Sequence, residues 1–145
     1  MTRQLKREKI DEVLREIIVP FLREKGFKGS LPHFRRIQSD RINLLTFQHS
    51  LYDTKFVVEL ANCPLNGIIT PSGEKIAPSK CTAHHMGYRL RIGSNVHNTD
   101  YWFDYSHSSL FNNVYNRIAK EIIELWDEAE DWWNKDPYNQ RIINT

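Results

Sequence analysis

The sequence predicts an α+β domain, in which an antiparallel sheet of about five or six strands carries an N-terminal helix and a long C-terminal helix on one face. Apolar residues recur at helical spacing near both ends of the chain. Between them, short segments rich in β-branched and aromatic residues are separated by polar turns. The length of 145 residues suits one domain, which we place at residues 1–136, followed by a polar tail at 137–145.

The first helix is predicted over residues 3–25. From Ile10 onward, apolar side chains recur three or four positions apart and form one stripe of an amphipathic helix. Pro20 lacks a backbone N–H inside that pattern, so we expect a kink or a restart near Val19. Gly26 then supplies the left-handed residue that ends the helix.

Three strands are predicted next, over residues 34–38, 42–48 and 54–61. The third strand shows the clearest alternation, because apolar side chains at every second position would face a core while the intervening ones face the other way. Its predicted core row is Phe56, Val58 and Leu60. The pattern is typical of antiparallel strands with one core face.

A loop-rich excursion is predicted after these strands. Residues 64–80 are dense in Pro, Gly, Ser and Asn, and the turn residues Pro71, Ser72 and Gly73 separate two short apolar segments. We therefore expect a small protruding hairpin, although a binding loop would have the same composition.

The segment CTAHHMGYRLRIG, residues 81–93, is interpreted as a further strand with alternating faces. In that register His85, Arg89 and Arg91 share one face, where two guanidinium groups about 6.6 Å apart suit a small anion. The alternative is that both arginines pair with acids on neighbouring strands or face solvent. Adjacent His84 and His85 would point to opposite faces, so we predict no metal site and no cofactor.

One more aromatic strand, near residues 100–105, leads into the second long helix. Ser108 or Ser109 is the expected N-cap. Apolar residues recur at spacings of three and four over residues 110–133, and Pro137 ends the pattern. This predicts one helix of about 25 residues.

The outer ridge of this helix carries like charges at spacings of three and four, namely Glu121, Glu124, Glu128 and Asp131. Like charges one turn apart repel, and acids near a helix C-terminus oppose the helix dipole, so a compensating basic group is expected. The internal candidate is the basic N-terminal helix, and the external candidate is a basic partner protein. Trp132 and Trp133 join the acids as candidate partner-binding residues, because tryptophan often dominates binding energy at interfaces.

Composition and motifs limit the classes of function. The sequence holds no Gly-rich phosphate loop, no His-Glu-x-x-His and no Gly-x-Ser-x-Gly motif, so no enzyme class is predicted. A formal net charge of +2 without a concentrated basic face does not favour a nucleic-acid partner. Cys63 and Cys81, without a Cys-x-x-Cys motif, indicate a reducing compartment. The apolar segment 17–22 is too short to span a membrane, so we expect a cytoplasmic protein with no membrane contact.

Several segments, in this order along the chain, resemble a bacterial domain-of-unknown-function family numbered 4304. The quoted segments are IIVPFLREKGFKG (17–29), HFRRIQSDRINLLTFQHS (33–50), FVVELA (56–61), YRLRIG (88–93) and DYWFDY (100–105). The resemblance implies a bacterial, single-domain α+β protein. It implies no activity and assigns no functional residue.

The leading functional hypothesis is a non-enzymatic protein-binding module, of an immunity type that neutralises a basic partner through the acidic C-terminal helix. The alternative is a small-anion-binding enzyme or sensor that uses His85, Arg89 and Arg91. The sequence does not specify an oligomeric state or the identity of any partner.

Overall fold

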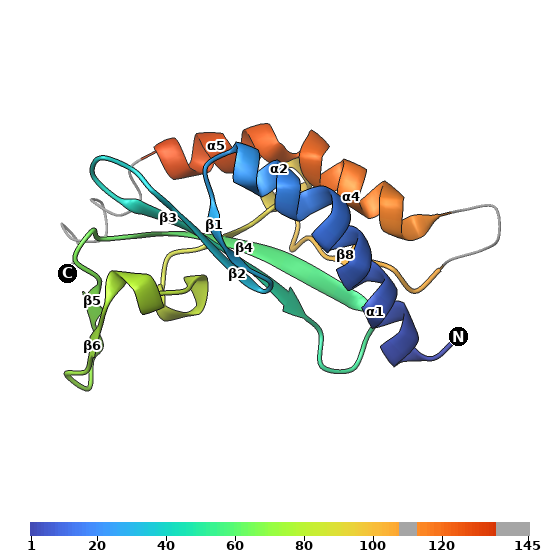
Figure 1. Ribbon diagram of the computed structural model, residues 1–145, viewed down its shortest axis with the longest axis horizontal. Coiled ribbons are helices and arrows are strands. Elements are labelled where there is room, and N and C mark those ends of the chain that lie inside the picture. The colour runs from blue at the N-terminus through green and yellow to red at the C-terminus, as the bar shows by residue number, and fades with distance from the viewer. Residues whose placement is uncertain (108–112, 136–145) are drawn as a thin grey trace.

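The computed structural model describes residues 1–107 and 113–135, which fold into two layers (Figure 1). The N-terminal and C-terminal helices lie side by side on one face of an antiparallel sheet, and their apolar faces meet that sheet in one core (Figure 1). The predicted α+β class, with both terminal helices on the same face, is confirmed. The predicted tail, residues 137–145, lies outside the described residues.

The N-terminal helix has three parts, α1 (Arg3–Val13), a π-helical turn (Leu14–Ile18) and α2 (Val19–Glu24). The backbone N–H of Val19 bonds to the carbonyl of Leu14, one residue further back than in an α-helix. Pro20 is the second residue of α2, which directly follows the π-helical turn, so the change in backbone hydrogen bonding falls where the chain lacks an N–H. The predicted restart near Val19 is therefore confirmed.

The larger sheet has the strand order β1-β2-β3-β4-β7, and β8 also pairs with β4. Every pairing is antiparallel. Three strands match the predicted ones apart from small shifts at their ends, and these are β2 (His33–Ile37), β3 (Ile42–His49) and β4 (Lys55–Cys63). Three further short strands complete the sheet, namely β1 (Lys28–Ser30), β7 (Leu90–Arg91) and β8 (Phe103–Asp104).

Strand β4 is buried on both of its faces. Phe56, Val58 and Leu60 pack toward the helices, as predicted. The opposite face carries Ala61 and Cys63, which belong to a second, smaller apolar cluster. That cluster is covered by the excursion after β4, which contains the predicted hairpin as β5 (Ile68–Ile69) and β6 (Lys75–Ile76) and then a 3₁₀ turn at Pro78–Lys80.

The prediction of a continuous strand over residues 81–93 is wrong. Residues Ala83–His85 form a 3₁₀ turn, and only β7 pairs with the sheet. The reason is a local capping box, in which the Nδ1 atom of His85 accepts a hydrogen bond from the backbone N–H of Thr82 at 2.9 Å. Tyr88, which the strand register would place on the core face with Leu90, is 43% exposed.

The C-terminal helix consists of α4 (Val114–Glu124) and α5 (Trp126–Asn134). Leu125 separates them, since its φ of −88° and ψ of 3° interrupt the helical geometry. The helix begins later than predicted, because the side chain of Asn113 caps α4 by accepting a hydrogen bond from the N–H of Asn116. Ser108 and Ser109, the expected caps, lie outside the described residues.

Among the described residues, no helix combines the length and the apolar character needed to span a membrane. Cys63 and Cys81 are both buried and both carry free thiols. Burial and the neighbouring Cys81 thiol raise the pKa of Cys63 to about 12, so this sulfur stays protonated.

Candidate ligand-binding site

A row of polar side chains crosses the sheet on the face that points away from the helices. In the strand register His33 pairs with Thr46, Thr46 with Glu59, and Glu59 with Arg91. Residues paired in this way project to the same face of a sheet, so four neighbouring strands contribute to one row. The Nδ1 atom of His33 lies 2.9 Å from the hydroxyl oxygen of Thr46, which joins two members of the row.

Glu59 is the buried centre of this row. Its side chain is 3% exposed, although it lies in the middle of an otherwise apolar stretch of β4. Oε2 of Glu59 lies 3.2 Å from Nε of Arg89, and Oε1 lies 3.5 Å from Nη2 of Arg91. Within the described part of the chain, Oε2 nevertheless accepts no hydrogen bond. A buried charged acceptor without a hydrogen bond is costly, so this oxygen marks a place where a further donor would be favourable.

The two arginines differ in how firmly they are held. Nη1 of Arg91 lies 2.9 Å from each carboxylate oxygen of Asp100, and its guanidinium stacks 5.1 Å from the ring centre of Trp102. Arg89 is 38% exposed and, among the described residues, has only its contact with Glu59. Arg91 is therefore held by three groups, whereas Arg89 is held by its ion pair with Glu59.

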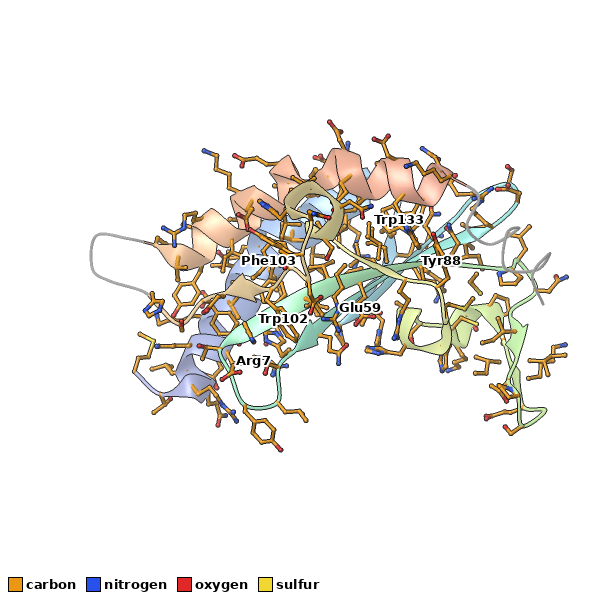
Figure 2. All side chains as sticks on the ribbon, turned by 180° about the vertical axis from the view of Figure 1, so that it is seen from behind. Arg7, Glu59, Tyr88, Trp102, Phe103 and Trp133 are labelled. Carbon is orange, nitrogen blue, oxygen red and sulfur yellow. The ribbon has the colours of Figure 1, made fainter. Side chains whose placement is uncertain are left out.

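These residues open onto a pocket of about 600 Å³. Ligand pockets in proteins span roughly 300–1,000 Å³, so a small molecule fits. Figure 2 shows Glu59 and Trp102 beside β4, and Glu59 lines the pocket. The lining is mainly polar, and its members are Glu59, Gly87, Arg89, Leu90, Arg91, Ser94, Asn98, Thr99 and Asp100.

One rim of the pocket is the short helix α3 (Ser94–His97) with the residues that follow it. The carboxylate of Glu128 on α5 accepts hydrogen bonds from the backbone N–H groups of Gly93 and Val96, at the start of this helix. These N–H groups have no partner within a helix, so the acid satisfies donors that would otherwise be unpaired. The rim is thus tied to the C-terminal helix.

A second tie joins the rim to α4. The hydroxyl of Tyr101 donates a hydrogen bond to Glu121 at 2.9 Å, and its ring stacks on His97 with ring centres 4.2 Å apart. Burial, together with the hydrogen bond to Glu121, raises the pKa of Tyr101 to about 12, so the phenol remains a donor. Gly93 has a φ of 97°, and a Cβ there would come within 2.4 Å of the Tyr101 ring.

The four acids predicted to bind a partner therefore fall into two pairs with different surroundings. Glu121 and Glu128 hold the pocket rim, so the internal groups that offset their charge come from residues 93–101 rather than from the basic N-terminal helix. Glu124 and Asp131 are exposed on the outer surface. Whether they bind a partner stays a prediction.

The two tryptophans predicted to bind a partner lie inside the protein. Trp133 is 1% exposed, and its ring N–H donates a hydrogen bond to the carbonyl of Ala61 at 3.1 Å. Trp132 is also buried, and its ring stacks on Tyr88 with ring centres 5.6 Å apart. Both side chains are thus core residues, and neither ring offers a free surface.

Of the residues predicted to bind an anion, Arg89 and Arg91 are brought together and His85 is not. His85 lies in the capping box of the 3₁₀ turn and does not line the pocket. The alternative reading of the arginines, that they pair with an acid on a neighbouring strand, is what the structure shows at Glu59. The described residues contain no group of three or more His, Cys, Asp or Glu arranged to hold a metal ion.

Glu59 belongs to no known motif, but its place in the sequence is unusual. It is the one acid in the segment FVVELANC, between residues whose side chains are otherwise apolar or uncharged. A charged residue in a strand buried on both faces needs a partner, so such a residue marks a candidate site.

A family model described as Domain of unknown function (DUF4304) matches residues 18–136. The chain belongs to this family. The part of this DUF4304 protein that matches the family model includes every strand of the larger sheet and every residue that lines the pocket around Glu59. Helix α1 precedes the matched range. No curated protein and no solved structure matches the chain.

Proposed function

We propose that this protein binds a small zwitterionic ligand of the amino-acid type in the pocket formed by β4, β7 and residues 93–100. The observation that supports this function is Oε2 of Glu59, a buried carboxylate oxygen without a hydrogen bond that lies against an arginine with free donors. An ammonium group on a ligand would give Oε2 its missing donor. A carboxylate on the same ligand would occupy the guanidinium of Arg89.

The charges of the site favour a ligand with both signs over a bare anion. Glu59 and Asp100 offset Arg89 and Arg91, so the four groups have no formal excess charge. A lone anion would have to compete with Glu59 for the arginines. A zwitterion replaces the contact between Glu59 and Arg89 with one new ion pair for each of them, so no buried charge loses its partner.

Binding in this way requires Arg89 to move. The side chain of Arg89 covers Oε2 of Glu59 at 3.2 Å, and a ligand reaches that oxygen when the guanidinium turns outward into the pocket. Arg89 has no other partner among the described residues, so this ion pair is the contact that the rotation must break, and the ligand replaces it. Arg91 stays in place because Asp100 holds it.

The rest of the pocket is organised before the ligand arrives. Ser94, Asn98 and Thr99 bring hydroxyl and amide groups to the rim, where they suit the polar remainder of a ligand. Glu128 and Glu121 fix that rim to the C-terminal helix. A rim that is already ordered loses little conformational entropy on binding, which favours affinity for a small molecule.

The experiment is a thermal-shift screen with free L-amino acids, followed by titration calorimetry of those that stabilise the protein. Matched amines and carboxylic acids, each lacking one of the two charges, serve as ligand controls. A ligand at one hundred times its Kd should add about 2.7 kcal/mol of stability. We expect a subset of amino acids to stabilise the protein and the singly charged analogues to fail.

Two variants locate the binding in this pocket. Arg89→Gln should abolish the ligand-induced stabilisation, and circular dichroism should show that the variant, in which Glu59 keeps its ion pair with Arg91, remains folded. Arg15→Gln, an exposed arginine on the π-helical turn, is the matched control and should bind as the parent does. The proposal fails if no amino acid shifts the melting temperature, or if both variants bind equally well.

A basic partner protein remains a second candidate function, supported by the acids that the structure leaves exposed on α4 and α5. These are Glu124, Asp127 and Asp131. Without exposed tryptophans such an interface would depend on electrostatic attraction, which weakens with salt. Affinity capture at low salt should retain a basic partner on the parent protein, and Glu124→Lys with Asp131→Lys should release it.

A further inference from the structure

A second pocket, of about 420 Å³, lies between α1 and the turn that follows β3. It shares no lining residue with the pocket around Glu59. Its mouth carries the exposed Arg3 and Arg7 from α1, and its lining includes Phe47, Leu51 and Tyr105. The lining also includes one acid, Asp53, whose carboxylate lies 4.0 Å from Nζ of Lys55. Its lining contains more apolar surface than that of the first pocket, and two arginines from α1 stand at its mouth.

A chain of polar contacts runs from the core to this mouth. The hydroxyl of Tyr105 lies 3.0 Å from Nδ1 of His49, and Nε2 of His49 lies 3.2 Å from Oδ1 of Asp11. Asp11 then accepts a hydrogen bond from Nε of Arg7 at 3.3 Å. The Nε2–H of His49 donates to the Asp11 carboxylate, and the Tyr105 hydroxyl is the partner of Nδ1.

This chain fixes the position of Arg7. Burial alone would raise the pKa of Asp11, but the hydrogen bond and charge of His49 and the charge of Arg7 outweigh it and lower that pKa. Asp11 is therefore a charged anchor. Arg7 itself is 50% exposed, and its two terminal nitrogens have no acceptor among the described residues.

Arg3 stands one helical turn before Arg7, so the two side chains project from the same side of α1. Nη1 of Arg3 donates to the carbonyl of Leu51 at 2.8 Å, which holds its guanidinium over the same mouth. No carboxylate pairs with Arg3 in the part of the chain that the structure describes. Figure 2 shows Arg7 between α1 and the turn that joins β3 to β4.

We infer that this second pocket binds an oxyanion, a carboxylate or a phosphate, that is carried on a small apolar or aromatic group. The anion oxygens bind the free guanidinium nitrogens of Arg3 and Arg7, because planar guanidinium groups match the geometry of both oxyanions. The apolar part of the ligand packs against Phe47 and Leu51. This site is independent of the zwitterion pocket, and it stands if that proposal fails.

The test is an NMR titration of the ¹⁵N-labelled full chain with sodium benzoate and, separately, with phenyl phosphate. We expect saturable amide shifts at Gln4, Ser50 and Leu51, with no shifts of residues 94–100. Saturation by benzoate alone or by phenyl phosphate alone supports the site and tells which oxyanion it prefers. The absence of saturable shifts at these residues with both probes would overturn the inference.

Two substitutions and a control separate a built site from general charge attraction. Arg3→Gln and Arg7→Gln should each weaken binding about tenfold, since each removes one charge-assisted contact. Lys9→Gln changes an exposed charge on the same helix that does not line the pocket, and it should leave the affinity unchanged. Equal weakening by Lys9→Gln would show only non-specific attraction to α1 and would overturn the inference.

Discussion

Glu128 accepts a hydrogen bond from the backbone N–H of Val96 at 2.8 Å, across 32 positions of the sequence. The same carboxylate accepts the N–H of Gly93. A side chain that sequence reasoning placed on an acidic outer ridge thus holds the rim of a pocket. The relationship connects the C-terminal helix to the rim of the candidate ligand site.

Replacing Glu128 by alanine should loosen this rim without unfolding the protein. Two backbone donors would lose their acceptor, which should lower the free energy of unfolding by about 1–3 kcal/mol. Hydrogen exchange at the amides of Gly93 and Val96 should accelerate, as measured by NMR. Glu124→Ala, at an exposed position of the same helix, should change neither property by more than about 0.5 kcal/mol. Unchanged hydrogen exchange at Gly93 and Val96 in the Glu128 variant would show that Glu128 does not hold the rim.

Gly93→Ala should destabilise the protein more than Gly73→Ala does. Both glycines have a positive φ, 97° and 90°, so each substitution introduces backbone strain of about 1–2 kcal/mol. A Cβ at Gly73 meets nothing within 4 Å, whereas one at Gly93 meets the Tyr101 ring at 2.4 Å. Urea denaturation of the two variants should therefore separate strain from steric conflict. Equal losses would mean that Tyr101 moves aside freely.

Tyr105→Phe tests the polar chain that positions Arg7. Loss of the hydroxyl leaves Nδ1 of His49 without its partner in a buried setting, which should cost about 1–3 kcal/mol of stability. Benzoate or phenyl phosphate should also bind more weakly, although Tyr105 does not hold the anion. Tyr52→Phe, at an exposed tyrosine, is the control and should affect neither stability nor affinity.

Stability should fall in acid partly because of Glu130. Burial alone would raise the pKa of Glu130, but hydrogen bonds from Arg36 at 2.6 and 2.9 Å and the charge of Arg36 lower it below its usual value of 4.5. A carboxyl group whose pKa is lower in the folded chain than in the unfolded chain stabilises the folded state when the pH is above the unfolded-state pKa. This contribution to stability is lost as the pH falls through the pKa of Glu130 in the folded chain.

The measurement is the free energy of unfolding between pH 7 and about pH 3, for the parent and for Glu130→Gln. The parent should lose more stability over this interval than the variant, because the variant lacks the titrating group. Parallel curves would show that the ion pair with Arg36 contributes no pH dependence.

The parts of the fold that could be predicted are those with local patterns. The helical stripe after Ile10, the alternation in β4 and the turn around Gly73 each depend on neighbours along the chain, and the structure contains all three. The 3₁₀ turn at residues 83–85 escaped prediction because one side-chain contact, from His85 to the Thr82 N–H, outweighs a strand-like alternation.

The candidate site was harder to predict, because strand register is not local. Nothing near Glu59 in the sequence indicates that Arg91 lies opposite it, since β7 returns to β4 only after a long excursion. The arginines were identified from their own spacing, and the acid they share was missed. Trp132 and Trp133 were assigned to an interface from their residue type alone. In the structure Trp133 packs against Phe27 and Trp132 against Tyr88, so both lie inside the protein.

The segment that forms the pocket rim also covers one edge of strand β4. Along its outer edge, β7 and β8 pair with only Lys55, Phe56, Glu59 and Leu60, and between them the N–H of Ile92 bonds to the carbonyl of Val58. Residues 88–105 therefore close the edge of a long apolar strand. An open edge of this kind recruits strands from other molecules, so the same contacts that shape the pocket also protect the protein from aggregation.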